Sequence, residues 1–304
     1  MLRRSFLHSR CKAVWFVLAT ALAVGLPCAL AQAQQRLDFD PLELVRLASK
    51  NEIKANDVLY YRMFRDTIQY KDHSVTREIV RTPQGGLAAT LLINGRPLTA
   101  AERQKDNDRL LKFANNPDAR RRQREASKAD DKRAELMLAS LPDAFLYTYA
   151  GTDRGPQGEE LVHLKFRPNP KFVPPNHETA VFTGMQGEMI IDRKAMRIAK
   201  IDGTLFKDVD FGWGILGRLY KGGKFIIVQR DVGGGDWEEV QETLQFAGRI
   251  LFVKALTVWS TETMTDFRPI PDNLTTAQAL DLLHKSVELA EENGGVKEAQ
   301  NHHQ

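Results

Sequence analysis

Beyond residue 40, the order of apolar and polar positions predicts one short helix followed by three strands. Asp40 can cap the free amides of a first turn that Pro41 begins, and apolar side chains then recur at helical spacing to about Lys54. Three runs rich in branched and aromatic residues follow: 58–70, 74–82 and 87–93. Asn94-Gly95 is a strong turn signal after the third run. We expect three adjacent antiparallel strands.

The pattern changes between residues 99 and 140, where the chain is heavily charged and has no glycine. Pro117 is expected to separate two helices, and Thr99 with Glu102 has the spacing of a capping box. Residues 101–135 hold 11 basic and 8 acidic side chains, with one cluster of arginines: Arg120, Arg121, Arg122 and Arg124. This insertion is either a site for an acidic partner or a solvated helical pair with mixed charges, and we favour the solvated pair.

Most of the chain from 143 to 270 is predicted to be strand. Turn-rich pieces separate seven runs: 145–150, 160–167, 187–192, 197–211, 225–232, 237–247 and 250–267. This spacing indicates an α+β protein that is mainly antiparallel β, with one large sheet that is either curled or closed. A final helix is expected from Thr275 or Thr276 to about Leu289, and residues 291–304 are expected to be a disordered tail.

The first 33 residues have the organisation of a cleavable export signal. A start with four basic residues precedes an apolar run from Ala13 to Ala31, and small residues around Gln32 place the cleavage before Gln34. The alternative is a membrane anchor, which Gly25-Leu26-Pro27 disfavours because it breaks the run. We therefore expect a periplasmic protein that is not an integral membrane protein, with a single domain over residues 34–290.

Two details of the signal bear on processing. Cys28 suggests a lipoprotein, but Pro27 stands where a lipidation site needs a small residue. Arg3-Arg4-Ser5-Phe6-Leu7 resembles the twin-arginine motif, which implies export of a folded protein by a bacterium. A basic start is common to all export signals, so the sequence does not decide between the twin-arginine route and the general Sec route.

The net charge of the mature part differs from that of the whole chain. The 304 residues contain 43 basic and 39 acidic side chains, and four of the basic ones lie in the signal, so the mature part has 39 of each. A neutral domain gives no electrostatic reason to expect nucleic acid as a partner. Cys11 and Cys28 also lie in the signal, so we expect no disulfide and no cysteine metal site in the mature domain.

Motifs for catalysis are missing from the mature sequence. Its histidines lack the spacing of a zinc protease, and no serine stands in a nucleophile elbow. Gly233-Gly234-Gly235 lacks the lysine and the helix of a phosphate loop, so it predicts a hairpin turn. Glu238 and Glu239 are adjacent and are expected to face opposite sides of a strand. We expect no catalytic residue, metal or cofactor.

Residues 211–219 alternate large apolar side chains with glycines between two predicted strands. One interpretation is a flexible apolar lip at the mouth of a cavity that takes an acyl chain. The other is a turn whose aromatic side chains fill the core, which is the commoner arrangement because such residues are usually buried.

Residues 185–192 and 197–201 form a strand–turn–strand in which a glycine precedes an aliphatic pair and an aspartate. This segment, within an exported chain of one helix and a long meander, resembles the superfamily of the periplasmic lipoprotein carriers LolA and LolB. The resemblance covers most of residues 36–270. It implies an unclosed antiparallel barrel, a half-barrel with helices on its concave side around an apolar cavity, which carries lipidated proteins. The inserted pair at 99–140 is longer than in these carriers.

Three functions follow as alternatives. The first is a periplasmic carrier for a lipid-like or acylated ligand, and the second is a non-enzymatic module of the cell envelope that binds a protein partner and fills its sheet with its own side chains. A hydrolase is the third. In a carrier, residues 58–70 and 205–211 are expected to form part of the wall and residues 213–219 part of the rim. The candidate ligand contacts are Tyr61, Met63, Leu205, Phe211, Trp213, Leu216 and Leu219.

Overall fold

The computed structural model describes residues 38–56, 61–82, 85–211, 217–250 and 254–301. The predicted export signal lies outside these residues, as do Trp213 and Leu216 of the predicted rim. Over the described ranges, no helix combines the length and the apolar character that a membrane span requires.

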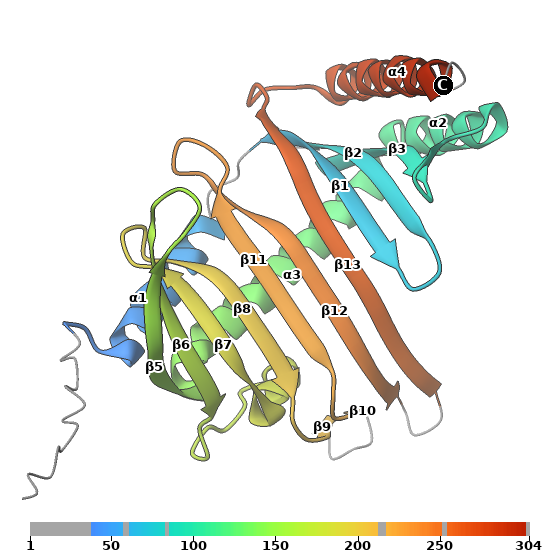
Figure 1. The fold of residues 1–304 in the computed structure, drawn as a ribbon. Helices are drawn as coiled ribbons and strands as arrows, with labels where there is room; N and C mark the ends of the chain where they lie inside the picture. Colours follow the sequence, from blue (N-terminus) through green and yellow to red (C-terminus); the bar gives the residue numbers. More distant parts are fainter. Residues whose placement is uncertain (1–37, 57–60, 83–84, 212–216, 251–253, 302–304) are drawn as a thin grey trace, which may run out of the picture. The chain divides into compact units, whose positions relative to one another are not determined.

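One sheet of 13 strands dominates the described part of the chain (Figure 1). Its hydrogen-bonded order is β4-β3-β2-β1-β13-β12-β11-β8-β7-β6-β5, and the short β9 and β10 pair beside β12. The strands are β1 (Arg62–Tyr70), β2 (Ser74–Thr82), β3 (Gly85–Ile93), β4 (Arg96–Pro97), β5 (Phe145–Arg154), β6 (Glu160–Pro168), β7 (Met185–Asp192), β8 (Arg197–Leu205), β9 (Val209–Phe211), β10 (Gly217–Leu219), β11 (Lys224–Asp231), β12 (Trp237–Ile250) and β13 (Lys254–Pro269). Pairing is antiparallel throughout, and the described edge strands β4 and β5 do not meet, so the predicted unclosed half-barrel is confirmed.

Glycines account for several of the tight places in this sheet. Asn94 and Gly95 have φ of 52° and 75°, the left-handed conformation that a two-residue hairpin turn requires. Gly233, Gly234 and Gly235 also have positive φ between β11 and β12, as the hairpin prediction requires. At Gly187 in β7, a Cβ atom would lie 1.9 Å from the carbonyl oxygen of Asp202 in β8. The glycine of the strand–turn–strand motif is therefore needed for close approach of the backbone.

The two inserted helices lie where the sequence predicts them. Helix α2 (Ala100–Ala114) begins with the predicted capping box of Thr99 and Glu102. Helix α3 (Pro117–Ala144) begins after Asn116, whose side chain accepts a hydrogen bond from the amide of Ala119. The helix continues four residues past its expected end and includes Pro142, because burial of its last turn against the sheet outweighs the loss of one backbone donor.

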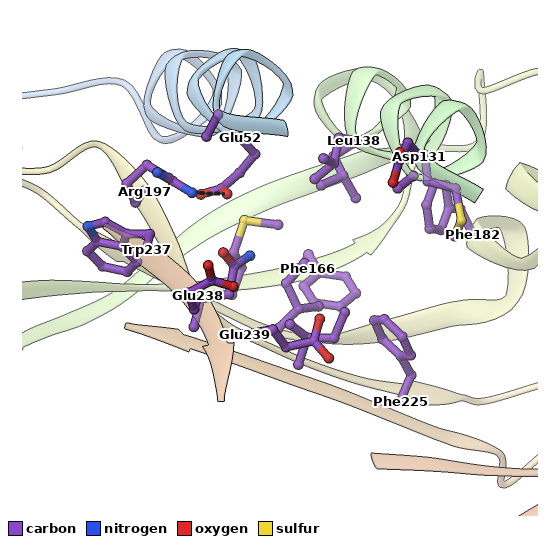
Figure 2. Close-up of a pocket in the computed structure, with 18 of the residues that line it drawn as sticks. Glu52, Asp131, Leu138, Phe166, Phe182, Arg197, Phe225, Trp237, Glu238 and Glu239 are labelled. Carbon is purple, nitrogen blue, oxygen red and sulfur yellow. Dashed lines mark hydrogen bonds and ion pairs between the residues drawn. The ribbon is translucent and has the colours of Figure 1, made fainter. Parts of the chain in front are cut away.

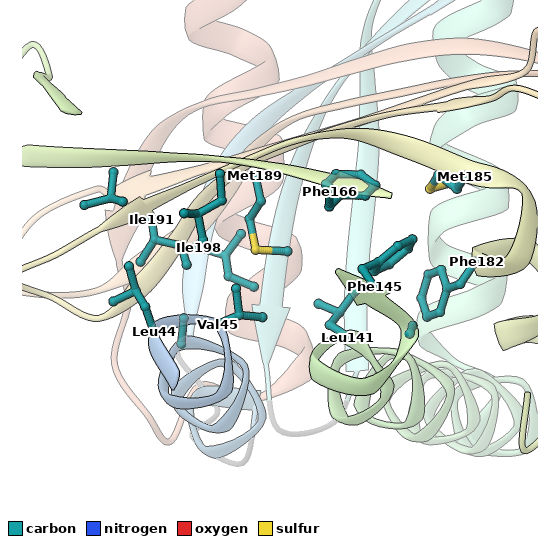
Figure 3. Close-up of a cluster of buried hydrophobic side chains, with 14 of the residues drawn as sticks. Leu44, Val45, Leu141, Phe145, Phe166, Phe182, Met185, Met189, Ile191 and Ile198 are labelled. Carbon is teal, nitrogen blue, oxygen red and sulfur yellow. The ribbon is translucent and has the colours of Figure 1, made fainter. Parts of the chain in front are cut away.

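Helices α1 (Pro41–Asn56) and α3 and the short 3-10 helix η1 (Glu178–Gly184) bury the first of two apolar clusters against the sheet. Figure 3 shows α1 and α3 on the same side of the strands, with Leu44 and Val45 of α1 directed at Met189 and Ile191, and Leu141 of α3 beside Phe145. This is the concave face that the prediction assigned to the helices.

A second cluster lies where α2 and α4 (Thr276–Asn301) pack on β2 and β3. Val80 belongs to this cluster, whereas the next residue, Arg81, lies on the side of α3. Since successive side chains of a strand point to opposite faces, the two clusters occupy opposite faces of one sheet. The backbone of α4 is helical to Asn301, where we expected a tail from residue 291, and it continues through Asn293-Gly294-Gly295.

Candidate functional site

A cavity of about 560 Å³ lies between the concave face of the sheet and helices α1 and α3 (Figure 2). Pockets for small molecules commonly have volumes of about 300–1,000 Å³. Helix α3 contacts the sheet near its two ends, at β3 and at β5, so its middle part bridges the cavity. The residues that α3 turns toward the cavity recur at helical spacing: Ser127, Asp131, Ala134, Met137, Leu138 and Leu141.

The inner wall of the cavity is aromatic and aliphatic. The ring of Phe145 lies 4.7 Å from that of Phe166 and 5.2 Å from that of Phe182, between ring centroids, so these side chains fix one another. Strands supply most of the remaining apolar lining: Met185, Met189, Ile201, Phe225 and Ile227. Methionine side chains adapt easily to ligands of different shape, so this wall suits a flexible chain.

A buried ion pair forms one part of the cavity lining. Glu52 on α1 accepts hydrogen bonds from both Nε and Nη2 of Arg197 at 2.8 Å, and a third from the amide of Ile198 at 2.8 Å. The guanidinium of Arg197 lies 5.5 Å from the ring centroid of Trp237. This arrangement joins α1 to the start of β8 and neutralises Arg197.

Another set of ion pairs surrounds Glu238 at the start of β12. Its carboxylate lies 2.8 Å from Nε of Arg62 and 3.4 Å from Nη1 of Arg81. Arg62 also lies 2.5 Å from the carboxylate of Asp236. Two arginines and two carboxylates therefore balance here.

Glu239 also lines the cavity, contrary to the expectation that it faces away from Glu238 (Figure 2). The pairing of β11 with β12 shifts by one residue next to it, with Gln229 opposite Glu239 and Val228 opposite Gln241. The extra residue of such a bulge disrupts the strict alternation of side chains. Burial, and then the charge and hydrogen bond of Glu242, raise the pKa of Glu239 to about 8.

The sequence-predicted contacts lie elsewhere. Met63 belongs to the second cluster, under α2 and α4, while Leu205 belongs to the first cluster, with Phe211 and Leu219 packed against it. Tyr61 directly precedes β1. None of these five residues lines the cavity, and Trp213 and Leu216 lie outside the described residues. Their role in ligand binding stays a prediction.

Sequence reasoning missed the contribution of α3. The signal for it was present, because Met137, Leu138 and Leu141 interrupt a charged helix at the spacing of one face. The arginine cluster of the same helix lies toward its other end. Arg120 donates a hydrogen bond to the hydroxyl of Thr276 at the start of α4, and Arg121 is exposed and pairs with Asp118 one turn before it.

Where the structure describes side chains, no group of His, Cys, Asp and Glu has an arrangement that could hold a metal ion. His163 lies outside the cavity and contacts Asp153 and Glu188, each at 3.2 Å. The ionisable side chains that line the cavity are Glu52, Arg81, Asp131, Arg197, Glu238 and Glu239.

Comparisons with known proteins give little guidance. No family model matches this chain, and no curated protein matches it. Among solved structures, it is similar to the crystal structure of a DUF1329 family protein from Desulfovibrio piger, with a TM-score of 0.25 and 10% sequence identity over 81% of this chain and 100% of the other. A TM-score this low does not establish a shared fold, so the case for a function rests on the cavity.

Proposed function

We propose that this protein binds and carries a lipid-like or acylated ligand, with the acyl chain in the cavity between the sheet and α3. The observation that carries the proposal is the cavity itself, which has an aromatic and methionine-rich wall. Each methylene group that leaves water for such a wall contributes about 0.8 kcal/mol, so an acyl chain gains affinity with its length.

The cavity favours a carrier over a module that fills its sheet with its own side chains. A self-filled core packs to crystal-like density and leaves no volume for a ligand. The unclosed sheet with helices on its concave side also agrees with the resemblance to the lipoprotein carriers. In this proposal the protein is not an enzyme, and it acts in the periplasm after residues 1–33 have been removed.

The test is lipid analysis of protein recovered from the periplasm, combined with titration of the neutral fluorescent probe N-phenyl-naphthylamine. We expect acyl lipids in the purified protein and saturable binding of the probe. Leu138→Trp on α3 narrows the cavity and should weaken probe binding by about tenfold, equivalent to about 1.4 kcal/mol.

The matched control is Leu289→Trp on α4, where the leucine is 58% exposed and α4 packs against β2 and β3, on the face opposite the cavity. This variant should bind the probe like the parent protein. Parent protein that contains no lipid and binds no probe would contradict the carrier function. Equal loss of binding in both tryptophan variants would show that the cavity is not the site.

A further inference from the structure

The charges around the cavity do not balance. Each arginine that lines the cavity has a carboxylate partner, because Arg197 pairs with Glu52 and Arg81 with Glu238. Two further carboxyl groups line the cavity: Asp131 on α3 and Glu239 on β12. Neither of them forms an ion pair with a lysine or an arginine among the described residues. A ligand in the cavity therefore meets more carboxyl groups than guanidinium groups.

The excess continues along the concave face beyond Glu239. Glu239 shares a hydrogen bond with Glu242 on the same strand, and Glu242 lies opposite Glu262 on β13. Glu262 in turn shares a hydrogen bond with Asp66 on β1. One cation, Arg77 on β2, ends this row, with its Nε 3.0 Å from Asp66. In the described part of the sheet, four carboxyl groups thus face one guanidinium.

The four carboxyl groups of Glu239, Glu242, Glu262 and Asp66 form a carboxyl row, and Asp66 shows that this row lacks positive charge. Its side chain is fully buried, and its Oδ1 atom has no hydrogen-bond partner among the described residues unless Glu262 is protonated. Burial and then Asp66 raise the pKa of Glu262 to about 7, and burial raises the pKa of Glu239 to about 8. Near neutral pH a shared proton lets the carboxyl groups of each pair, Glu239 with Glu242 and Glu262 with Asp66, lie close together without repulsion. The positive charge of a ligand can replace such a proton.

We propose that the cavity selects an amphiphile with a cationic polar group, such as an alkylammonium, over anionic and neutral amphiphiles with the same chain. The chain lies along the wall of Phe166, Met189 and Phe225, and the cation lies beside Glu239. This inference rests on the proposed function. It assigns the class of ligand, because an uncompensated carboxylate in a partly buried site attracts a cation and repels an acid.

The test uses displacement of N-phenyl-naphthylamine from the mature protein by three ligands with one chain length: dodecyltrimethylammonium, laurate and monolaurin, each below its micelle concentration. The cationic ligand should bind at least about tenfold more tightly than laurate. Its affinity should also rise with pH until Glu239 is ionised, at about pH 8, by at most about tenfold per pH unit. The groups that face Glu239 and set this midpoint are Glu238, Glu242 and Glu262.

Glu239→Gln keeps the size of the side chain and removes its charge, so it should reduce the preference for the cation by about fivefold or more. Glu288→Gln, at an exposed position of α4 on the opposite face, is the matched control and should leave the preference unchanged. Thermal unfolding of both variants checks that they fold.

The outcomes separate the two claims. Equal affinity for the three ligands, tighter binding of laurate, or an unchanged preference in Glu239→Gln would each overturn the inference while leaving the carrier function intact. Failure of the parent protein to bind N-phenyl-naphthylamine would remove the carrier function and the inference together.

Discussion

The two faces of this sheet bury their apolar side chains in different ways. Under α2 and α4 the contact residues include alanines from both helices and from β3, which allow the helices to approach the strands closely: Ala89, Ala114 and Ala279. On the concave face the buried cluster also contains phenylalanines and methionines, which the buried cluster under α2 and α4 has only in Met63: Phe145, Phe166, Phe182, Met185 and Met189. Helix α3 contacts the sheet mainly at its ends. Small residues give a filled layer, whereas large residues below a bridging helix leave a cavity.

The comparison separates two roles for buried leucines. A leucine in the filled layer stabilises the fold and is not needed for binding. A leucine on the bridging part of α3 contributes less to stability, because it faces the cavity, and is needed for binding. The following predictions test this division, beginning with the largest expected effect.

Leu283→Ala on α4 removes a fully buried side chain from the filled layer. Lost burial and a new cavity should lower the free energy of unfolding by about 2–5 kcal/mol, measured with urea. Affinity for N-phenyl-naphthylamine should change by less than about twofold, because α4 lies on the opposite face. A variant that loses probe binding while it is still folded would break the comparison.

The free energy of unfolding should fall as pH rises from about 4.5 to about 8. In this window the folded protein holds a proton on Glu239 that the unfolded chain has released, because burial raises the pKa of Glu239 from 4.5 to about 8. Each pKa unit is equivalent to about 1.4 kcal/mol, so the rise from 4.5 to about 8 corresponds to at most about 5 kcal/mol. The free energy of unfolding of Glu239→Gln should therefore exceed that of the parent at alkaline pH, by at most this amount.

The same pair of proteins should differ much less at acidic pH, where the parent is protonated in both states. Glu288→Gln should follow the pH dependence of the parent at every pH. If Glu239→Gln retained the pH dependence of the parent, the carboxyl row would not be the source of it.

Leu138→Ala on α3 should have the smallest effect on stability, about 1 kcal/mol or less, because this side chain is only partly buried. Probe affinity should fall by about threefold, since the ligand loses an apolar contact. The comparison with Leu283→Ala uses the same substitution on opposite faces. Comparable destabilisation of the two variants would mean that α3 packs as tightly as α4.

Local sequence signals predicted much of the fold. Pro117, the pair Asn94-Gly95 and the glycines at 233–235 interrupt the chain where the structure has a helix boundary and two hairpin turns. These signals work because each acts through the backbone of its own neighbours. The order of strands could not be predicted in this way, since the pairing of β1 with β13 joins distant segments.

The cavity was harder to predict than the fold. Periodicity identifies a side chain as apolar on one face, but Leu138 at the cavity and Leu110 in the filled layer have the same signature. What separates them is the distance between a helix and the sheet, which depends on side chains from many segments. The expectation for Glu238 and Glu239 was wrong because one inserted residue, visible only in the pairing of two strands, changes the alternation.

The pairing of β1 with β13 has a consequence for the order of events during biosynthesis. Strand β1 pairs on one side with β2 and on the other side with β13, which is the last of the described strands. The hydrogen-bonding edge of β1 therefore stays unpaired during synthesis until β13 has been made. Contacts between such distant segments also slow folding. The sheet of the nascent chain is therefore incomplete until β13 has been synthesised, and until then its open edge needs protection from aggregation.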